Sequence, residues 1–368
     1  MTVTEHHDVT TELAMVDLDR EEQRARALEV LEDFLPERTK GGQALVAYRV
    51  SISFGGVKAV QDVSLVVPAH TFVGLLGPNG AGKSTLFDLL NGLKRPDSGQ
   101  VTLFGEDVTN QAPWDRAKLG MGRTFQANKI NLNLTVGENL VSAAHQLIEG
   151  GLFSTLLGLP KAFASEQRAR DAALAMACLL DIDQHFDDRA EELDFGRQRR
   201  VEIGRSLMSG PSVLLLDEPA AGLDAHEVAS LFELLRKLQQ DLGLTVVLVE
   251  HYVKAVLDNA DIVYVLNQGR LIASGTPGQV VADPVVQEEY LGNVLGTEAD
   301  EATQAGTTSI DTAVGGRHRE TGAGNGSVGG APNEIAYDDG HTTEPTDYLT
   351  QRETGAVTPG EHDRSEER

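Results

Sequence analysis

A glycine-rich segment at residues 77–85 constrains the fold of this chain more than any other feature. It reads Gly77-Pro78-Asn79-Gly80-Ala81-Gly82-Lys83-Ser84-Thr85. The apolar run 71–76 before it is typical of a buried strand, and the run 86–90 after it opens a helix. The glycines let successive backbone N–H groups face inward around an anion, and the helix N-terminus adds partial positive charge.

Two side chains in this loop carry phosphate chemistry. Lys83 is placed to reach the β- and γ-phosphates, and the Ser84 hydroxyl is placed to hold Mg²⁺. A glycine turn before an ordinary helix is the alternative, but it would not require lysine and serine in this register. We therefore predict that the chain binds a nucleoside triphosphate.

Composition limits the class of protein. The net charge of −25 argues against a nucleic-acid backbone as partner, so no nucleic acid is expected. The single cysteine, Cys178, cannot form an internal disulfide. Apolar runs stay well short of the ~18 residues of a membrane span, and the polar N-terminus lacks a secretory signal pattern. These features predict a soluble cytoplasmic protein.

The charge also suggests where the folded unit lies. Residues 297–368 hold 15 acidic and 5 basic residues and a glycine-rich run, which predicts an acidic, disordered tail. Residues 1–44 form an N-terminal extension with 11 acidic and 5 basic residues. Within it a short helix is expected over 21–35, followed by a linker at 37–43. Its apolar positions are Ala25, Leu28, Leu31 and Leu35. The folded unit is expected at about 45–296.

The pattern within 45–296 is α/β. Runs 46–54 and 57–67 predict an antiparallel edge sheet, and the short apolar runs 213–217 and 245–249, each followed by a helical stretch, predict parallel strands beside the glycine loop. Residues 262–266 and 270–273 predict a closing hairpin. Between about 135 and 210 no strand pattern remains, which predicts an inserted all-α subdomain containing a helix over 166–180.

Polar residues follow the predicted parallel strands. Asp217 at the end of the strand 213–217 suits a Mg²⁺ ligand, and Glu218 suits a general base for the attacking water. His251 follows the strand 245–249 and could contact a γ-phosphate or that water, although a lone histidine there is more often structural. Gln126 taken alone would be a solvated loop amide. The segment 193–200 precedes a helix, whose N-terminal amides near Gly196 could cap a phosphate.

Together these motifs resemble the ATP-binding subunit of ABC transporters over about 45–296. The resemblance implies Walker A at 77–85, a signature motif at 193–198, Walker B at 213–218 and a D-loop at 220–224. It implies Phe54 as the aromatic on adenine, Gln126 as the glutamine that touches Mg²⁺ and senses the membrane partner, and His251 as the switch histidine.

The resemblance thus implies ATP and Mg²⁺ as ligands, with Glu218, His251 and Lys83 as catalytic residues and Ser84, Gln126 and Asp217 at the metal. The implied nucleotide-binding set is Phe54, Gly77, Pro78, Asn79, Gly80, Ala81, Gly82, Lys83, Ser84, Thr85, Gln126, Asp217, Asp194, Gly196 and Gln198. The implied partners are permease subunits, a second ABC ATPase paired head to tail, and indirectly a solute-binding protein. The implied place is the cytoplasmic side of the plasma membrane.

Finer details resemble one branch of the family. The segments 122–126, 198–205 and 217–223, the helical insert with its apolar stretch 151–160, and the ending 283–292 are similar to ATPases of branched-chain amino acid importers. Urea and amide importers and some lipid-handling ATPases share much of this pattern. The cargo itself is not read from an ATPase, which never touches it.

Two positions depart from the family pattern. Asp194 stands where a serine usually donates to the γ-phosphate, and a carboxylate about 4 Å from a phosphate charge would cost roughly 4 kcal/mol per charge. Either Asp194 turns away and amides near Gly196 make the contact, or this signature half is weak; the first is favoured because the resembling branch tolerates non-serine residues here. Tyr252 replaces a common acidic residue, and little effect is expected.

Two other functions are compatible with parts of this sequence. A nucleotide-sensing, regulatory ABC protein is disfavoured by the intact Lys83, Glu218 and His251, although Asp194 and the acidic tail would suit it. A soluble ABC protein of translation or DNA repair would carry two cassettes or long coiled-coil arms, and neither pattern occurs in this sequence.

Overall fold

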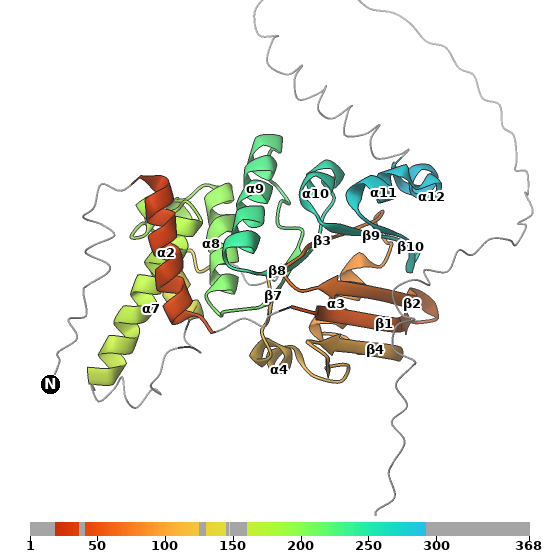
Figure 1. Cartoon of the computed structure of the whole chain (residues 1–368), viewed down its shortest axis with the longest axis horizontal. Coiled ribbons are helices and arrows are strands. Elements are labelled where there is room, and N and C mark those ends of the chain that lie inside the picture. The colour runs from red at the N-terminus through yellow and green to blue at the C-terminus, as the bar shows by residue number, and fades with distance from the viewer. Residues whose placement is uncertain (1–18, 37–40, 125–129, 145–146, 148–159, 292–368) are drawn as a thin grey trace, which may run out of the picture. The chain divides into compact units, whose positions relative to one another are not determined.

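Two sheets organise the fold of the computed structural model, which describes residues 19–36, 41–124, 130–144, 147 and 160–291 (Figure 1). The larger sheet has six strands in the order β10-β9-β3-β8-β7-β6, and the smaller has four in the order β2-β1-β4-β5. The larger sheet comprises β3 (Phe72–Leu76), β6 (Met121–Arg123), β7 (Val213–Asp217), β8 (Thr245–Val249), β9 (Ile262–Asn267) and β10 (Arg270–Gly275). The smaller comprises β1 (Gln43–Phe54), β2 (Val57–Pro68), β4 (Ser98–Leu103) and β5 (Glu106–Asp107).

The helices follow the order of an α/β protein with a helical insert. They are α2 (Arg20–Phe34), α3 (Lys83–Asn91), α4 (Pro113–Lys118), α5 (Val136–Ala143), α7 (Pro160–Leu179), α8 (Phe195–Leu207), α9 (Ala225–Asp241), α10 (Val253–Asn259), α11 (Pro277–Ala282) and α12 (Pro284–Val286). Within the described residues from 130 to 210, β-pairing is limited to one isolated bridge between Thr135 and Arg189. The other regular elements of this part of the chain are helices.

The fold class expected from the sequence is confirmed. Strands β6, β7, β8, β3 and β9 pair in parallel, β10 closes the edge antiparallel to β9, and the smaller sheet is antiparallel. The predicted strands lie within one or two residues of β2, β7, β8 and β9, while β1 begins three residues earlier than expected. The short strands β4, β5 and β6 were not predicted.

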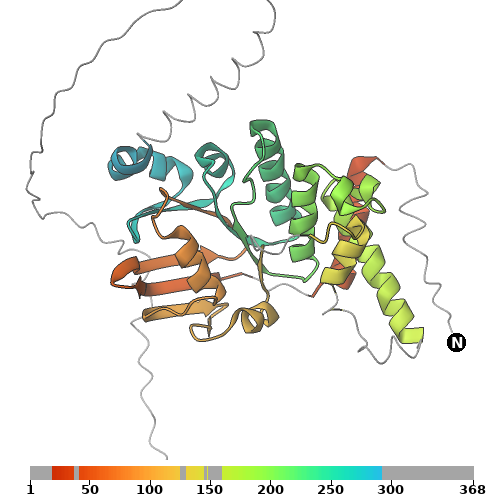
Figure 2. The same ribbon diagram turned by 180° about the vertical axis from the view of Figure 1, so that it is seen from behind.

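The larger sheet is buried on both faces by alternating residues. In β3, Phe72 and Leu76 pack with Phe232 of α9 in one cluster, whereas Val73 and Leu75 pack with Phe87 of α3 in the other. Helices α9 and α3 therefore cover opposite faces of this sheet (Figures 1 and 2). All five residues of β3, β7 and β8 are buried, as expected for central parallel strands.

The N-terminal helix α2 packs beside α7 of the helical part (Figures 1 and 2). Asp19 caps α2 by accepting hydrogen bonds from the backbone N–H groups of Glu21 and Glu22. Leu31 is 1% exposed and joins the core cluster. Ala25, expected on the apolar face, is exposed, and Ala27 is buried in its place.

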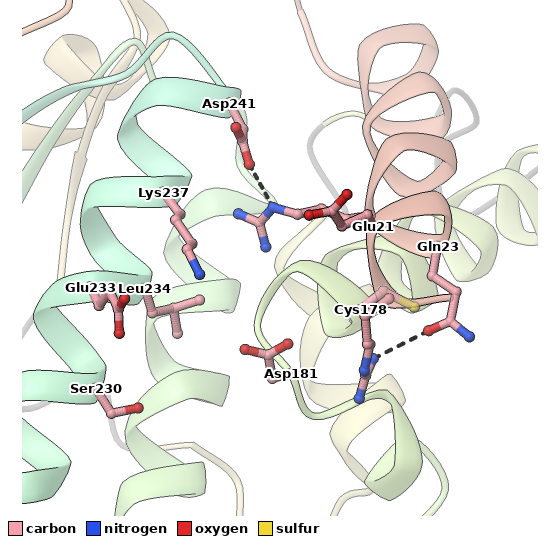
Figure 3. Close-up of a pocket in the computed structure, with 11 residues that line it drawn as sticks. Glu21, Gln23, Cys178, Asp181, Ser230, Glu233, Leu234, Lys237 and Asp241 are labelled. Atoms are coloured by element: carbon pink, nitrogen blue, oxygen red, sulfur yellow. Dashed lines mark hydrogen bonds and ion pairs between the residues drawn. The ribbon is translucent and has the colours of Figure 1, made fainter. Parts of the chain in front are cut away.

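Polar contacts hold α2 to α9, to α7 and to the turn after α7. Arg24 Nε donates to Asp241 Oδ2 at the end of α9 at 2.6 Å, which is the dashed line at Asp241 in Figure 3. Arg24 Nη1 also donates to the carbonyl of Leu179 at the end of α7 at 3.2 Å, and Arg20 pairs with Asp183 at 2.8 Å. Within the described part of the chain, these contacts make α2 part of the packed core.

We expect the buried face of α2 to contribute measurably to stability. Leu31→Ala should lower the free energy of unfolding by about 2–4 kcal/mol, because a buried leucine loses its contacts and leaves a cavity. Glu32→Ala, at an exposed position on the same helix, is the control and should change it by less than about 0.5 kcal/mol. Equal unfolding midpoints in urea for the two variants would show that α2 is not docked.

Some expectations fall outside the described residues. These are the acidic tail 297–368, Gln126 and most of the apolar stretch 151–160. Among the helices that are described, none has the length and apolar character needed to cross a bilayer.

Candidate functional site

The glycine loop has the strand–loop–helix setting that its sequence predicts. It follows the buried strand β3, and α3 begins at Lys83 with Gly82 as its N-terminal cap. Gly77 and Gly82 have φ angles of 147° and 99°, and a Cβ on either would lie 2.1 Å from Leu266 O or 2.3 Å from Ala59 O. Only glycine fits these two positions, so the curled backbone is a requirement of the packing.

Lys83 lies inside this loop. Its side chain donates from Nζ to the carbonyls of Gly77 at 2.5 Å and Pro78 at 3.1 Å, and the residue is 6% exposed. Burial lowers the pKa of Lys83, while the charges of Glu218 and Asp217 act in the opposite direction. The ammonium group is thus held over the loop by two carbonyls, close to two carboxylates. Ser84 is exposed in the first turn of α3, and Thr85 follows it.

Asp217 ends β7 and is held by a basic side chain. Its Oδ2 accepts from Arg123 Nη2 at 2.9 Å, and Arg123 also pairs with Asp88 at 2.8 Å. Burial raises the pKa of Asp217, and the Arg123 guanidinium opposes this shift. The other oxygen, Oδ1, is buried and has no hydrogen-bond partner in the described part of the chain. A buried, unpartnered carboxylate oxygen is suited to a cation.

The donors around Asp217 fit Mg²⁺ that is shared with a nucleotide. Mg²⁺ is usually held by one or two carboxylates together with substrate phosphates and water. Asp217 Oδ1 is a carboxylate oxygen of this kind, and Ser84 offers a hydroxyl oxygen in the first turn of α3. The residues that the structure describes contain no cluster of three or more His, Cys, Asp or Glu side chains that could hold a metal.

Glu218 and His251 are brought together from separate strands. His251 Nε2 lies 2.9 Å from Glu218 Oε1, and an ionised Glu218 only accepts, so the tautomer with the proton on Nε2 fits this contact. Glu218 has a φ of 48° in the left-handed region, and its N–H donates to the carbonyl of Val249 at 2.9 Å. A strained backbone at such a place is held by its surroundings and often marks a functional residue.

Phe54 lies at the end of β1 and is 45% exposed. Lys94 Nζ is 5.9 Å from the centre of its ring. An exposed ring at the end of a strand is available for stacking on a flat ligand.

Asp194 is turned toward its own helix. It is the N-cap of α8, where its Oδ1 accepts from the backbone N–H of Arg197 at 2.8 Å and its Oδ2 pairs with the Arg197 guanidinium. Gln198 Nε2 donates to the carbonyls of Ala190 and Leu193, both at 3.0 Å. Asp194 and Gly196 line a shallow pocket with Leu223 and Glu227. The signature segment thus lies beside the loop that follows Glu218.

The capping role of Asp194 gives a prediction. Asp194→Ser should leave the free energy of unfolding within about 0.5 kcal/mol and should not lower ATP turnover, because serine caps helices as well as aspartate does. Asp194→Ala should lower stability by about 1 kcal/mol, because the N–H of Arg197 loses its acceptor. Urea unfolding of both variants tests this. If Asp194→Ser were as destabilised as Asp194→Ala, the cap would not explain the aspartate.

The sequence did not predict the contacts of two residues at the site. Arg123 stood in the segment 122–126, but its contacts with Asp217 and Asp88 depend on β6 pairing beside β7. Glu250, between β8 and His251, is 1% exposed and accepts from the N–H of Ala220. An acidic residue directly before His251 was the available signal. Gln126 lies outside the described residues.

The chain is similar to proteins of one family. The ABC transporter family model matches residues 60–221. The high-affinity branched-chain amino acid transport ATP-binding protein LivG of Salmonella typhimurium is 40% identical over 239 residues, 65% of this chain and 94% of LivG. BraF of Pseudomonas aeruginosa, described in the same words, is 37% identical over 243 residues, 66% of this chain and 95% of BraF.

Two further similarities bear on substrate and fold. The lipopolysaccharide export system ATP-binding protein LptB of Haemophilus influenzae is 37% identical over 248 residues, 67% of this chain and 97% of LptB. An ATP-binding cassette of an ABC transporter, solved in its ADP conformation, is 30% identical with a TM-score of 0.59, covering 68% of this chain and all of that one.

Proposed function

Because this chain belongs to the ABC transporter family of ATP-binding proteins, which couple ATP hydrolysis to transport, we propose that it powers import of branched-chain amino acids through a separate permease. The proposed cargo is supported by the similarity to LivG and BraF over nearly their whole length. Both are described as branched-chain amino acid transport proteins. Import of urea or amides is an alternative to this proposal.

A lipid-handling system is the second candidate. LptB, described as a lipopolysaccharide export protein, is as similar to this chain as BraF is, at 37% identity. The 40% identity to LivG favours the amino acid importer. A purely regulatory ABC protein is disfavoured, because Lys83, Asp217, Glu218 and His251 are all present and His251 contacts Glu218.

The proposed hydrolysis follows from the placement of these side chains. The glycine loop and Lys83 bind the β- and γ-phosphates of ATP, and Phe54 stacks on the adenine. Glu218 takes the proton from the attacking water, and His251 holds the Glu218 carboxylate through the contact of 2.9 Å. Mg²⁺, held by Asp217, Ser84 and Gln126, would neutralise phosphate charge.

Further proposals concern the assembly. A cassette over about 45–296, with a helical insert at about 135–210, would pair head to tail with a second ABC ATPase. Gly196 and Gln198 of one subunit would then face the nucleotide held by the other. The pair would bind permease subunits at the cytoplasmic face of the plasma membrane, with a solute-binding protein on the other side. The N-terminal extension 1–44 and the acidic tail 297–368 would add to this cassette.

The transport proposal is tested by uptake. Cells lacking this chain should lose uptake of labelled leucine, isoleucine and valine, and the wild-type chain should restore it where Glu218→Gln does not. Normal uptake in the deletion strain, while the purified chain hydrolyses ATP, would contradict the cargo and leave the ATPase assignment standing. A defect in lipid export in the same strain would favour the second candidate.

A further inference from the structure

Glu250 is a buried carboxylate between the last residue of β8 and His251. The residue is 1% exposed. Burying a charged group is costly unless hydrogen bonds compensate for the lost water. Burial raises the pKa of Glu250, and two backbone N–H groups oppose this rise. A buried carboxylate directly before His251 is therefore expected to have a role other than packing.

Each oxygen of Glu250 is bonded to a different functional loop. Oε1 accepts from the N–H of Ala220 at 2.6 Å, in the loop that begins with Glu218. Oε2 accepts from the N–H of His251 at 3.0 Å. In the described part of the chain, the ion pairs do not include Glu250. The carboxylate therefore bridges the backbone of the two loops.

Neighbouring contacts join the same two loops. The N–H of Glu218 donates to Val249 O at 2.9 Å, and the Tyr252 hydroxyl donates to Leu223 O at 3.2 Å. Of the side chains that make these bridges, Glu250 is the buried one. Ala220 lies two residues after Glu218, whose φ is in the left-handed region. The Glu250 carboxylate therefore links the backbone N–H of Ala220 to the backbone N–H of His251.

We propose that Glu250 is a positioning residue for ATP hydrolysis, fixing the loop of Glu218 relative to His251. This inference rests on the proposed roles of Glu218 and His251. Glu250 does not act on the water itself, because both of its oxygens are bonded to backbone N–H groups and the side chain is inaccessible. Its effect passes through the 2.9 Å contact between His251 Nε2 and Glu218 Oε1.

Glu250→Gln in the full-length chain tests the proposal. The glutamine has nearly the same size, but its NH₂ group would face one of the two N–H donors, so one bridge is lost. We expect kcat for ATP to fall roughly 10- to 100-fold, because small misplacements of catalytic groups carry costs of this order. The KM and the affinity for ATP should change by less than about twofold, because the phosphate loop is not touched.

A second mutation separates positioning from a general loss of stability. In a His251→Ala background, Glu250→Gln should lower kcat by less than about threefold, because the contact that it positions is already gone. A merely structural residue would cause the same fold-change in both backgrounds. That additive result would overturn the proposal.

Gln239 offers a matched control. It is 4% exposed, and its Nε2 bridges the carbonyls of His70 at 2.7 Å and Leu244 at 3.1 Å, at the opposite end of β8. Gln239→Glu replaces a buried amide by a carboxylate, which is the reverse of the change in Glu250→Gln, and it removes the donor to the two carbonyls. It should lower the melting temperature while leaving kcat unchanged.

The outcomes also distinguish this inference from the proposed function. If the wild-type chain paired with its partner ATPase does not hydrolyse ATP, or if the pair carrying Glu218→Gln does so normally, the proposed site is wrong. If the wild type is active and Glu250→Gln has the same kcat, only the role of Glu250 is wrong. Should Glu250→Gln fail to fold, Glu250→Asp replaces it. Its shorter side chain cannot keep both bridges, and a wild-type kcat in that variant would equally refute the proposal.

Discussion

Replacing Glu218 by glutamine is expected to lower ATP turnover by at least about a hundredfold while leaving ATP affinity within about twofold. An amide cannot accept the proton of the attacking water, and general bases contribute roughly 10²- to 10⁴-fold to such steps. The phosphate loop and Lys83 are unchanged in this variant. Steady-state phosphate release and binding of a fluorescent ATP analogue measure the two quantities on the same protein.

The geometry around Glu218 sharpens this expectation. Glutamine can still accept from His251 Nε2 through its oxygen, so the contact of 2.9 Å and the loop are preserved. Glu233→Gln, the same chemical change at an exposed position on α9 (Figure 3), is the control and should leave turnover unaltered. Turnover at the wild-type rate in Glu218→Gln would mean that another group is the base.

Much of the fold was predictable because its strands are strongly patterned. The central strands β3, β7 and β8 are short, apolar and rich in β-branched or leucine residues, and the turn of 77–85 demands glycine at defined positions. The helix of 20–34 was also expected. Its docking on α7 was not, because the contacts of Leu31 and Arg24 join residues more than a hundred positions apart.

The weakly patterned elements escaped prediction for physical reasons. The first half of β4 and all of β5 are exposed, and β6 is three residues long, so none of them shows a clear apolar period.

The burial of Arg116 was also not predicted. It is fully buried and donates from Nη1 to the carbonyls of Leu89 at 2.8 Å and Leu90 at 2.5 Å, near the end of α3. Burial lowers its pKa to about 10.

The sequence predicts which residues form the candidate site better than it predicts the contacts that hold them. The types of Lys83, Asp217, Glu218 and His251 are dictated by chemistry and stand out in the sequence. Their supports depend on tertiary pairing: Arg123 reaches Asp217 across neighbouring strands, and Glu250 reaches Ala220 across two loops. For Asp194 the sequence left two alternatives, and the structure shows the side chain turned to cap α8.

Lys83→Ala is expected to weaken ATP binding at least about a hundredfold. The loop would keep its amides, but the phosphate charge would lose the buried ammonium group of Lys83, and charge-assisted bonds are about twice as strong as neutral ones. The change should not unfold the chain, because Lys83 bonds only loop carbonyls, those of Gly77 and Pro78, in the described structure.

The measurement is equilibrium binding of a fluorescent ATP analogue, with the melting temperature recorded in parallel. Lys118→Ala is the matched control, since Lys118 is a 72% exposed side chain paired with Asp115 on α4, and its loss should leave the Kd unchanged. Lys83→Ala should lose both binding and turnover, whereas Glu218→Gln should lose turnover alone. If Lys83→Ala bound ATP as tightly as the control, the triphosphate would not lie in the loop at 77–85, and the roles of Asp217 and Glu218 would fall with it.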